Sequence, residues 1–251
     1  MQHFLKLTLL RIFAAILVLF LISCTTTNPG SDYIIVSGGP ALRTWENLRA
    51  PTDQHDRYAG NFIKSARIRM DQLQEQHGGN LSITWFVYRP AYITREREDA
   101  QAGVPWSCGL SEIETHAAAS RAKLVWFSER SELLDHLNRH APGSIAGFEY
   151  FGHSNRYAFM FDCSNGIIGV STCYLHIRDL NQLKRGLFAR SAHVQSWGCS
   201  TADRRQGSLC MSGVWKRRTG HPMKGAIGKT DYRPIAANLL PIADPAFGWS
   251  E

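Results

Sequence analysis

The sequence predicts an α/β protein of three layers, a mostly parallel β-sheet with helices on both faces. Short apolar segments rich in β-branched and aromatic residues alternate along the chain with segments whose apolar residues have helical spacing. This alternation indicates parallel strands joined by crossover helices. Because the strands are apolar on both faces, both faces of the sheet must be covered.

The first predicted elements are a helix at 61–77 and a strand at 81–89, LSITWFVYR. Glycines at 78 and 79 end the helix. One face of this helix carries its apolar residues, Phe62, Ala66, Met70 and Leu73. Residues 90–110 contain prolines, glycines and mixed charge, and they are predicted to form a long loop.

The middle of the chain contains two further helix–strand pairs. A helix is expected at 111–122 and a buried strand at 123–128, KLVWFS. A second helix is expected at 128–140, followed by the strand 144–152, SIAGFEYFG. The remaining predicted elements are a hairpin of 156–163 with 167–175, a helix at 178–188, a strand at 192–198, a helix at 208–220 and a strand at 223–228.

The N-terminal residues resemble an export signal. Lys6 and Arg11 flank an apolar run that ends in Leu-Ile-Ser-Cys. This ending resembles the lipobox of bacterial lipoproteins, which implies lipidation of Cys24, and Thr25 after it favours the outer membrane. The alternative is an ordinary signal or membrane anchor. The predicted organisation is a signal peptide at 1–23, a tether at 24–32, an N-terminal extension at 33–60 and a single α/β domain at 61–251.

Charge and cysteine content limit the function classes. Removal of residues 1–23 leaves 26 basic and 21 acidic residues, a net charge of +5 that is scattered along the sequence and does not favour nucleic-acid binding. An exported chain is permitted disulfides. Without Cys24 the number of cysteines is odd, which fits at most two bridges and one reactive thiol. The remaining cysteines are Cys108, Cys163, Cys173, Cys199 and Cys210.

Two predicted strands end on reactive residues. The strand 144–152 is followed by His153 and Ser154, and the strand 192–198 by Cys199. If these strands are neighbours, their carboxyl ends bring His153 and Cys199 together, at the edge where open α/β sheets bind ligands. An imidazole beside a thiol can generate a thiolate and later protonate the leaving group. The predicted helix after Cys199 is expected to lower the pKa of this thiol.

The segments FEYFGHS and VQSWGCST, in this strand order, resemble the caspase-like cysteine peptidases, the superfamily of legumain, gingipains and clostripain. The resemblance covers roughly residues 80–230. It implies the caspase-like fold, His153 as general base, Cys199 as nucleophile, and an oxyanion hole formed by the backbone N–H groups of Ser154 and Cys199. The family usually has glycine after the histidine, where this chain has Ser154.

Other residues compete with this dyad as candidate sites. GHSNR resembles the Gly-x-Ser-x-Gly elbow of serine hydrolases, but it lacks the final glycine and a strand follows it. His136 and His140 have helical spacing but no third ligand, so no metal site is expected. Loops near the predicted edge can line a substrate pocket with Asp203, Lys229, Thr230 and Asp231.

The sequence therefore predicts a lipid-anchored, periplasm-facing cysteine peptidase-like hydrolase that acts on a protein or peptide without a cofactor. A binding or assembly lipoprotein of the same fold, with no catalysis, is the alternative, and a serine esterase using Ser154 is a further one. Substrate specificity and oligomeric state are not predicted.

Overall fold

The computed structural model of the chain describes residues 31–50, 54, 60–104, 108–167, 170–207 and 209–250. The predicted signal peptide and the predicted lipidation site Cys24 lie outside these ranges. Within them, no helix is both long and apolar enough to cross a bilayer.

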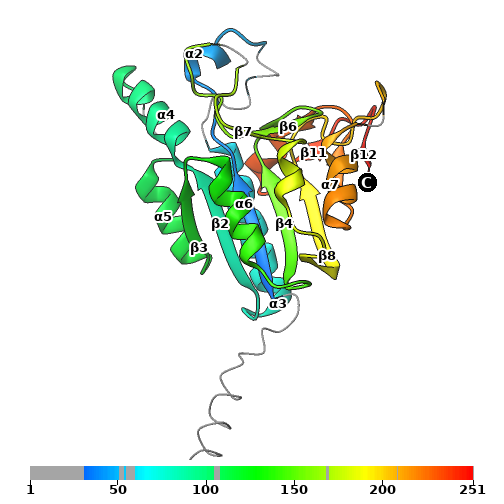
Figure 1. The fold of residues 1–251 in the computed structure, drawn as a ribbon. Helices are drawn as coiled ribbons and strands as arrows, with labels where there is room; N and C mark the ends of the chain where they lie inside the picture. Colours follow the sequence, from blue (N-terminus) through cyan, green and yellow to red (C-terminus); the bar gives the residue numbers. More distant parts are fainter. Residues whose placement is uncertain are drawn as a thin grey trace, which may run out of the picture.

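A five-stranded, fully parallel sheet forms the centre of the molecule, with the strand order β3-β2-β1-β4-β8 (Figure 1). The predicted three-layer α/β fold is confirmed. The strands are β1 (Asp32–Ser37), β2 (Ser82–Tyr88), β3 (Lys123–Phe127), β4 (Ile145–Phe151) and β8 (Phe188–Ser196).

Helices cover both faces of this sheet. Helices α3 (Asn61–His77) and α5 (Leu110–Ala119) pack on one face, and helices α6 (Arg130–Arg139) and α7 (Met211–Thr219) pack on the other (Figure 1). Both faces need a cover because successive side chains of β1 point to opposite faces of the sheet. Tyr33 and Ile35 pack in the core under α3 and α5, and Ile34 and Val36 pack in the core under α6 and α7.

The predicted N-terminal extension at 33–60 is wrong in its first part, because β1 (Asp32–Ser37) is the central strand of the sheet. The domain therefore begins at Asp32, the last residue of the predicted tether. The rest of this segment includes the short helix α2 (Arg43–Glu46).

The loop predicted for 90–110 is also wrong, since most of it is the helix α4 (Arg89–Gln101). Conversely, the helix predicted for 178–188 is reduced to the 3-10 turn η2 (Asp179–Gln182), after which the chain enters β8.

Shorter elements gather beyond the carboxyl ends of the parallel strands. β6 (Ala158–Met160) pairs with β7 (Tyr174–His176), as the predicted hairpin required, and also with β5 (His153–Ser154). The strand predicted for 223–228 contains β9 (Gly225–Ala226), which pairs with β12 (Trp249–Ser250), while Lys224 forms a parallel bridge to Gln195 of β8. The remaining elements are β10 (Thr230–Asp231), η3 (Arg233–Ala237) and β11 (Ile242–Ala243).

Candidate active site

His153 and Cys199 follow neighbouring parallel strands. β4 pairs with β8 with Tyr150 opposite Ser196, and the N–H of Trp197 extends the pairing by donating to the carbonyl of Tyr150 at 2.8 Å. Both predicted residues are half-buried and line one pocket of about 1080 Å³. The structure thus meets the condition on which the predicted dyad depends, because the two strands are neighbours and both residues line one pocket.

The backbone around Cys199 turns sharply and directs a donor at the sulfur. Ser200 adopts a left-handed conformation, with φ of +60°. Its N–H donates to the carbonyl of Gly228 at 2.8 Å, which holds the segment after β9 beside the cysteine. The N–H of Thr230 in turn lies 3.3 Å from the Sγ of Cys199. A donor in this position stabilises negative charge on the sulfur.

Packing by aromatic residues fixes His153. Its ring meets the edge of Phe62 from α3, with centroids 5.1 Å apart, and Phe62 also packs against Tyr232 at 5.2 Å. The hydroxyl of Tyr232 donates to the carbonyl of Trp197 at 3.0 Å. This chain of contacts connects the histidine to the strand end that carries Cys199.

The side chain of Ser154 lies against the cysteine's backbone. Its hydroxyl donates to the carbonyl of Cys199 at 2.7 Å, and Ser154 does not line the pocket. This geometry does not favour Ser154 as a nucleophile. The roles of the Ser154 and Cys199 N–H groups as oxyanion donors stay predictions.

Of the predicted pocket residues, Lys229, Thr230 and Asp231 line the pocket, and Asp203 does not. The carboxylate of Asp203 pairs instead with Arg205 at 2.9 Å, and this partner holds the pKa of Asp203 down to about 2. Asp231 also has an arginine partner, Arg233, at 2.7 Å.

Several pocket residues were missed: some precede the predicted domain, some lie in the first turn of α3, and one lies in the last 20 residues of the chain. Arg49, Gln54, Asn61 and Lys64 enter from the N-terminal side, and Asp244 from beyond β11. No local motif marks these positions, since only the placement of β1 beside β4 brings the segment before α3 to this edge.

The helix expected to lower the pKa of Cys199 begins next to a different cysteine. Cys210, not Cys199, is the N-cap of α7. Burial alone would raise the pKa of Cys210, but the Ser212 hydroxyl, the Gly213 N–H and Arg204 lower it below the ordinary value. Among the described cysteines the structure contains no disulfide.

The two histidines at the end of α6, His136 and His140, contact each other, and His140 also contacts Asp32. The Nε2 atoms of His136 and His140 lie 3.3 Å apart, and Nδ1 of His140 lies 3.3 Å from the carboxylate of Asp32. Throughout the described ranges no group of three or more potential metal ligands is found.

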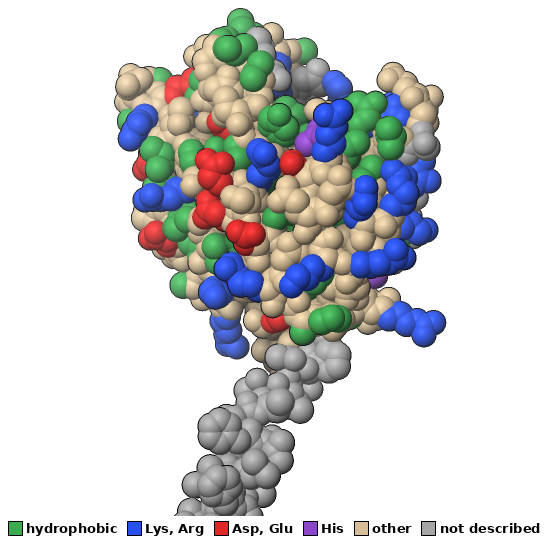
Figure 2. Space-filling view, in the orientation of Figure 1, with side chains coloured by type: hydrophobic (Ala, Val, Ile, Leu, Met, Phe, Trp, Pro, Cys, Tyr) green, Lys and Arg blue, Asp and Glu red, His purple; other side chains and the backbone are tan. Residues whose placement is uncertain are grey.

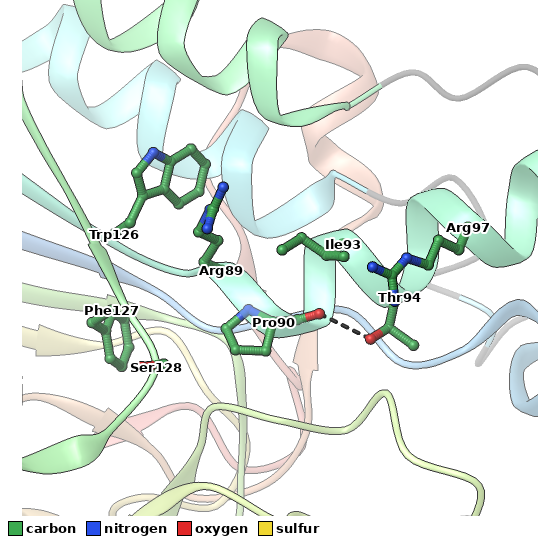
Figure 3. A pocket seen from close by; sticks show the side chains of 8 residues that line it. All are labelled: Arg89, Pro90, Ile93, Thr94, Arg97, Trp126, Phe127 and Ser128. Atoms are coloured by element: carbon green, nitrogen blue, oxygen red, sulfur yellow. Dashed lines mark hydrogen bonds between the residues drawn. The ribbon is translucent and has the colours of Figure 1, made fainter.

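A second, smaller hollow of about 430 Å³ lies at the same edge of the sheet, beside the start of α4. In Figure 3 the side chain of Arg89 extends between Trp126 and Ile93, and the hydroxyl of Thr94 bonds to the carbonyl of Pro90 at 2.9 Å. Since its lining includes no cysteine or histidine, this hollow lacks the nucleophile and base found in the larger pocket.

Comparison with known proteins gave no match: no family model, no curated protein and no solved structure is detectably similar to this chain.

Proposed function

We propose that the protein is a cysteine peptidase-like hydrolase, anchored in the bacterial cell envelope through a lipidated Cys24. The observation that carries the proposal is the convergence of His153 and Cys199 in one pocket at the ends of adjacent parallel strands. The same adjacency is required by the resemblance to caspase-like peptidases. The Thr230 N–H directed at the sulfur adds support, because a nucleophilic cysteine must carry negative charge.

In the proposed reaction, the thiolate of Cys199 attacks the carbonyl carbon of a peptide bond and forms a C–S bond. His153, protonated by the thiol, gives its proton to the amide nitrogen as the C–N bond breaks, and the amine product leaves. Water then attacks the thioester, with His153 accepting its proton. Cys199 departs as thiolate, and the carboxylic acid product is released.

The decisive experiment compares iodoacetamide labelling and turnover of a peptide library for the wild type, Cys199→Ala and His153→Ala. We expect labelling of Cys199 that falls sharply in His153→Ala, and turnover only in the wild type. Cys163→Ala is the matched control, since Cys163 is also half-buried but lies outside the pocket. An unreactive Cys199 would instead favour the non-catalytic binding or assembly lipoprotein.

A further inference from the structure

A basic surface surrounds the amino ends of the parallel strands, at the edge of the sheet opposite the candidate active site. Its residues lie just before β3 or β8, in the first residues of these strands, or at the carboxyl ends of α6 and α7. Eight exposed side chains form it: Arg121, Lys123, Arg139, Lys184, Arg185, Arg190, Arg217 and Arg218. We call this set the amino-edge basic face. Figure 2 shows lysine and arginine side chains along the lower and right-hand parts of this view, while most of the acidic side chains lie on the left.

The amino-edge basic face has few acidic neighbours to neutralise it. Asp32 is close to His140, Asp71 accepts a hydrogen bond from Ser120, and Glu75 is the remaining exposed acid near the end of α3. None of the eight basic side chains forms an ion pair with a described residue. At the opposite edge, ion pairs hold five arginines, Arg43, Arg49, Arg95, Arg205 and Arg233, although Arg89 and Arg97 form none with a described residue.

A notch within this face is large enough for a polar head group. It has a volume of about 560 Å³ and is lined by Arg185, Arg190 and His221, among others. The N–H of Gly186 donates to the carbonyl of Thr219 at 3.0 Å, so the two loops that form the notch are fixed to each other. Two unpaired guanidinium groups beside a rigid hollow suit phosphate oxygens, which arginine binds in a bidentate manner.

The position of this face relative to Cys24 favours a membrane as its partner. Only seven residues, 25–31, lie between Cys24 and Asp32, the first residue of β1, so the eight residue-to-residue steps span at most about 28 Å when fully extended. If Cys24 is held at a bilayer, the amino edge of the sheet lies next to it. Clustered basic residues beside a membrane anchor are attracted to anionic lipids.

We propose that the amino-edge basic face docks on anionic phospholipid head groups, with the notch at Arg185 and Arg190 receiving a head-group phosphate. This docking turns the opposite edge away from the bilayer. The seven residues of β4 span about 23 Å at the usual rise per residue. The pocket of His153 and Cys199 then faces the aqueous compartment, whatever its chemistry.

The test uses the full chain in neutral detergent micelles that also contain either phosphatidylglycerol or phosphatidylcholine. Hydrogen exchange is followed in residues 183–192, with residues 229–240 at the opposite edge as the internal reference. We expect phosphatidylglycerol alone to slow exchange in 183–192, and high salt to reverse the effect because the Debye length shrinks to about 3 Å at 1 M.

Two matched double variants locate the binding. Arg185→Gln with Arg190→Gln removes the notch guanidiniums, while Arg89→Gln with Arg97→Gln removes two exposed arginines of the hollow in Figure 3. Each basic residue at an anionic surface contributes about a fivefold gain, so the first variant should bind about 30-fold more weakly and the second normally.

Equal exchange with both lipids would overturn the proposal, as would protection that persists in the Arg185/Arg190 variant. Protection by inorganic phosphate alone would instead identify a free-phosphate site, and protection by a short DNA duplex a nucleic-acid surface. Unchanged exchange in residues 229–240 shows that each variant is folded.

Discussion

The hydroxyl of Ser154 donates a hydrogen bond of 2.7 Å to the carbonyl oxygen of Cys199. The same side chain fills the space next to Gly198, where an added Cβ would lie 2.2 Å from the Ser154 oxygen. Ser154, directly after the histidine, is therefore complemented in space by Gly198, directly before the cysteine. Together the two residues fix the distance between the strand ends that carry the proposed dyad.

This complementarity predicts that Gly198→Ala is destabilising and that a second substitution relieves it. The added methyl group overlaps the Ser154 hydroxyl, and overpacking of this kind costs about 1–3 kcal/mol in the free energy of unfolding. Ser154→Gly combined with Gly198→Ala should recover part of this loss. Recovery is incomplete because the carbonyl oxygen of Gly152 also lies 3.0 Å from the added Cβ.

Urea unfolding of the wild type, both single variants and the double variant measures the coupling directly. Gly166→Ala is the control, because an added Cβ there meets no atom within 4 Å. Simple additivity of the Ser154 and Gly198 effects would contradict the proposed complementarity.

The sequence predicts most of the longer elements whose buried face is apolar. The helix α6 buries Leu133, Leu134 and Leu137, and the helical spacing of these leucines predicts it. The helix α4 was missed because its buried face includes Arg95 and Asp99, which pair with each other at 3.2 Å. An ion pair that replaces apolar packing leaves no hydrophobic stripe for a sequence pattern to detect.

The candidate site was predictable to the extent that strand order determines it. His153 and Cys199 reach one pocket because β4 and β8 are adjacent, a pairing that the sequence alone leaves as a condition. The donor at Thr230 depends on a loop returning across the sheet edge, which no local pattern encodes. The central strand β1 has an apolar run, Tyr33–Val36, but this run directly follows the predicted tether and was therefore not predicted to be a strand of the sheet.

A buried carboxylate supports the strand end that carries the cysteine. Glu149 is fully buried, and it accepts hydrogen bonds of 2.6 Å from both Arg69 and the indole of Trp197, as well as one from the hydroxyl of Tyr33. Burial, together with the charge of Glu149, raises the pKa of Tyr33 well above its usual range.

Glu149→Gln should lower the free energy of unfolding by about 3 kcal/mol, because it leaves the guanidinium of Arg69 in the interior without its counter-charge. Chemical denaturation measures the loss. Glu112→Gln is the control, as it breaks a partly exposed contact with His116 and should change stability by no more than about 1 kcal/mol. Equal effects for the two variants would show that Glu149 is not a structural ion-pair partner.

The hydroxyl of Tyr232 makes a smaller contribution to the free energy of unfolding than Glu149 does. Tyr232→Phe removes its hydrogen bond to the carbonyl of Trp197 and preserves the ring contact with Phe62. We expect a loss of about 1 kcal/mol in the free energy of unfolding, the usual net value of a buried hydrogen bond. Tyr174→Phe, at an exposed position, should leave stability unchanged in the same assay. A neutral Tyr232→Phe would mean that the Trp197 carbonyl is satisfied without this donor.

His136 should make stability depend on pH in a specific window. Burial, reinforced by the nearby charges of His140, Arg139 and Lys123, lowers its pKa from 6.5 to about 4. Between these values the unfolded chain binds a proton that the folded protein excludes, so stability should fall as the pH decreases from 6.5 to 4 and this contribution should level off below.

His136→Gln removes that part of the pH dependence, and it also loses the packing of the imidazole on Phe86, 4.7 Å between ring centroids. Urea midpoints across the window therefore give a shallower slope for His136→Gln than for the wild type, whatever their difference at neutral pH. His77→Gln, which replaces an exposed histidine at the end of α3, should retain the wild-type slope. A wild-type slope in His136→Gln would assign the acid sensitivity to other groups.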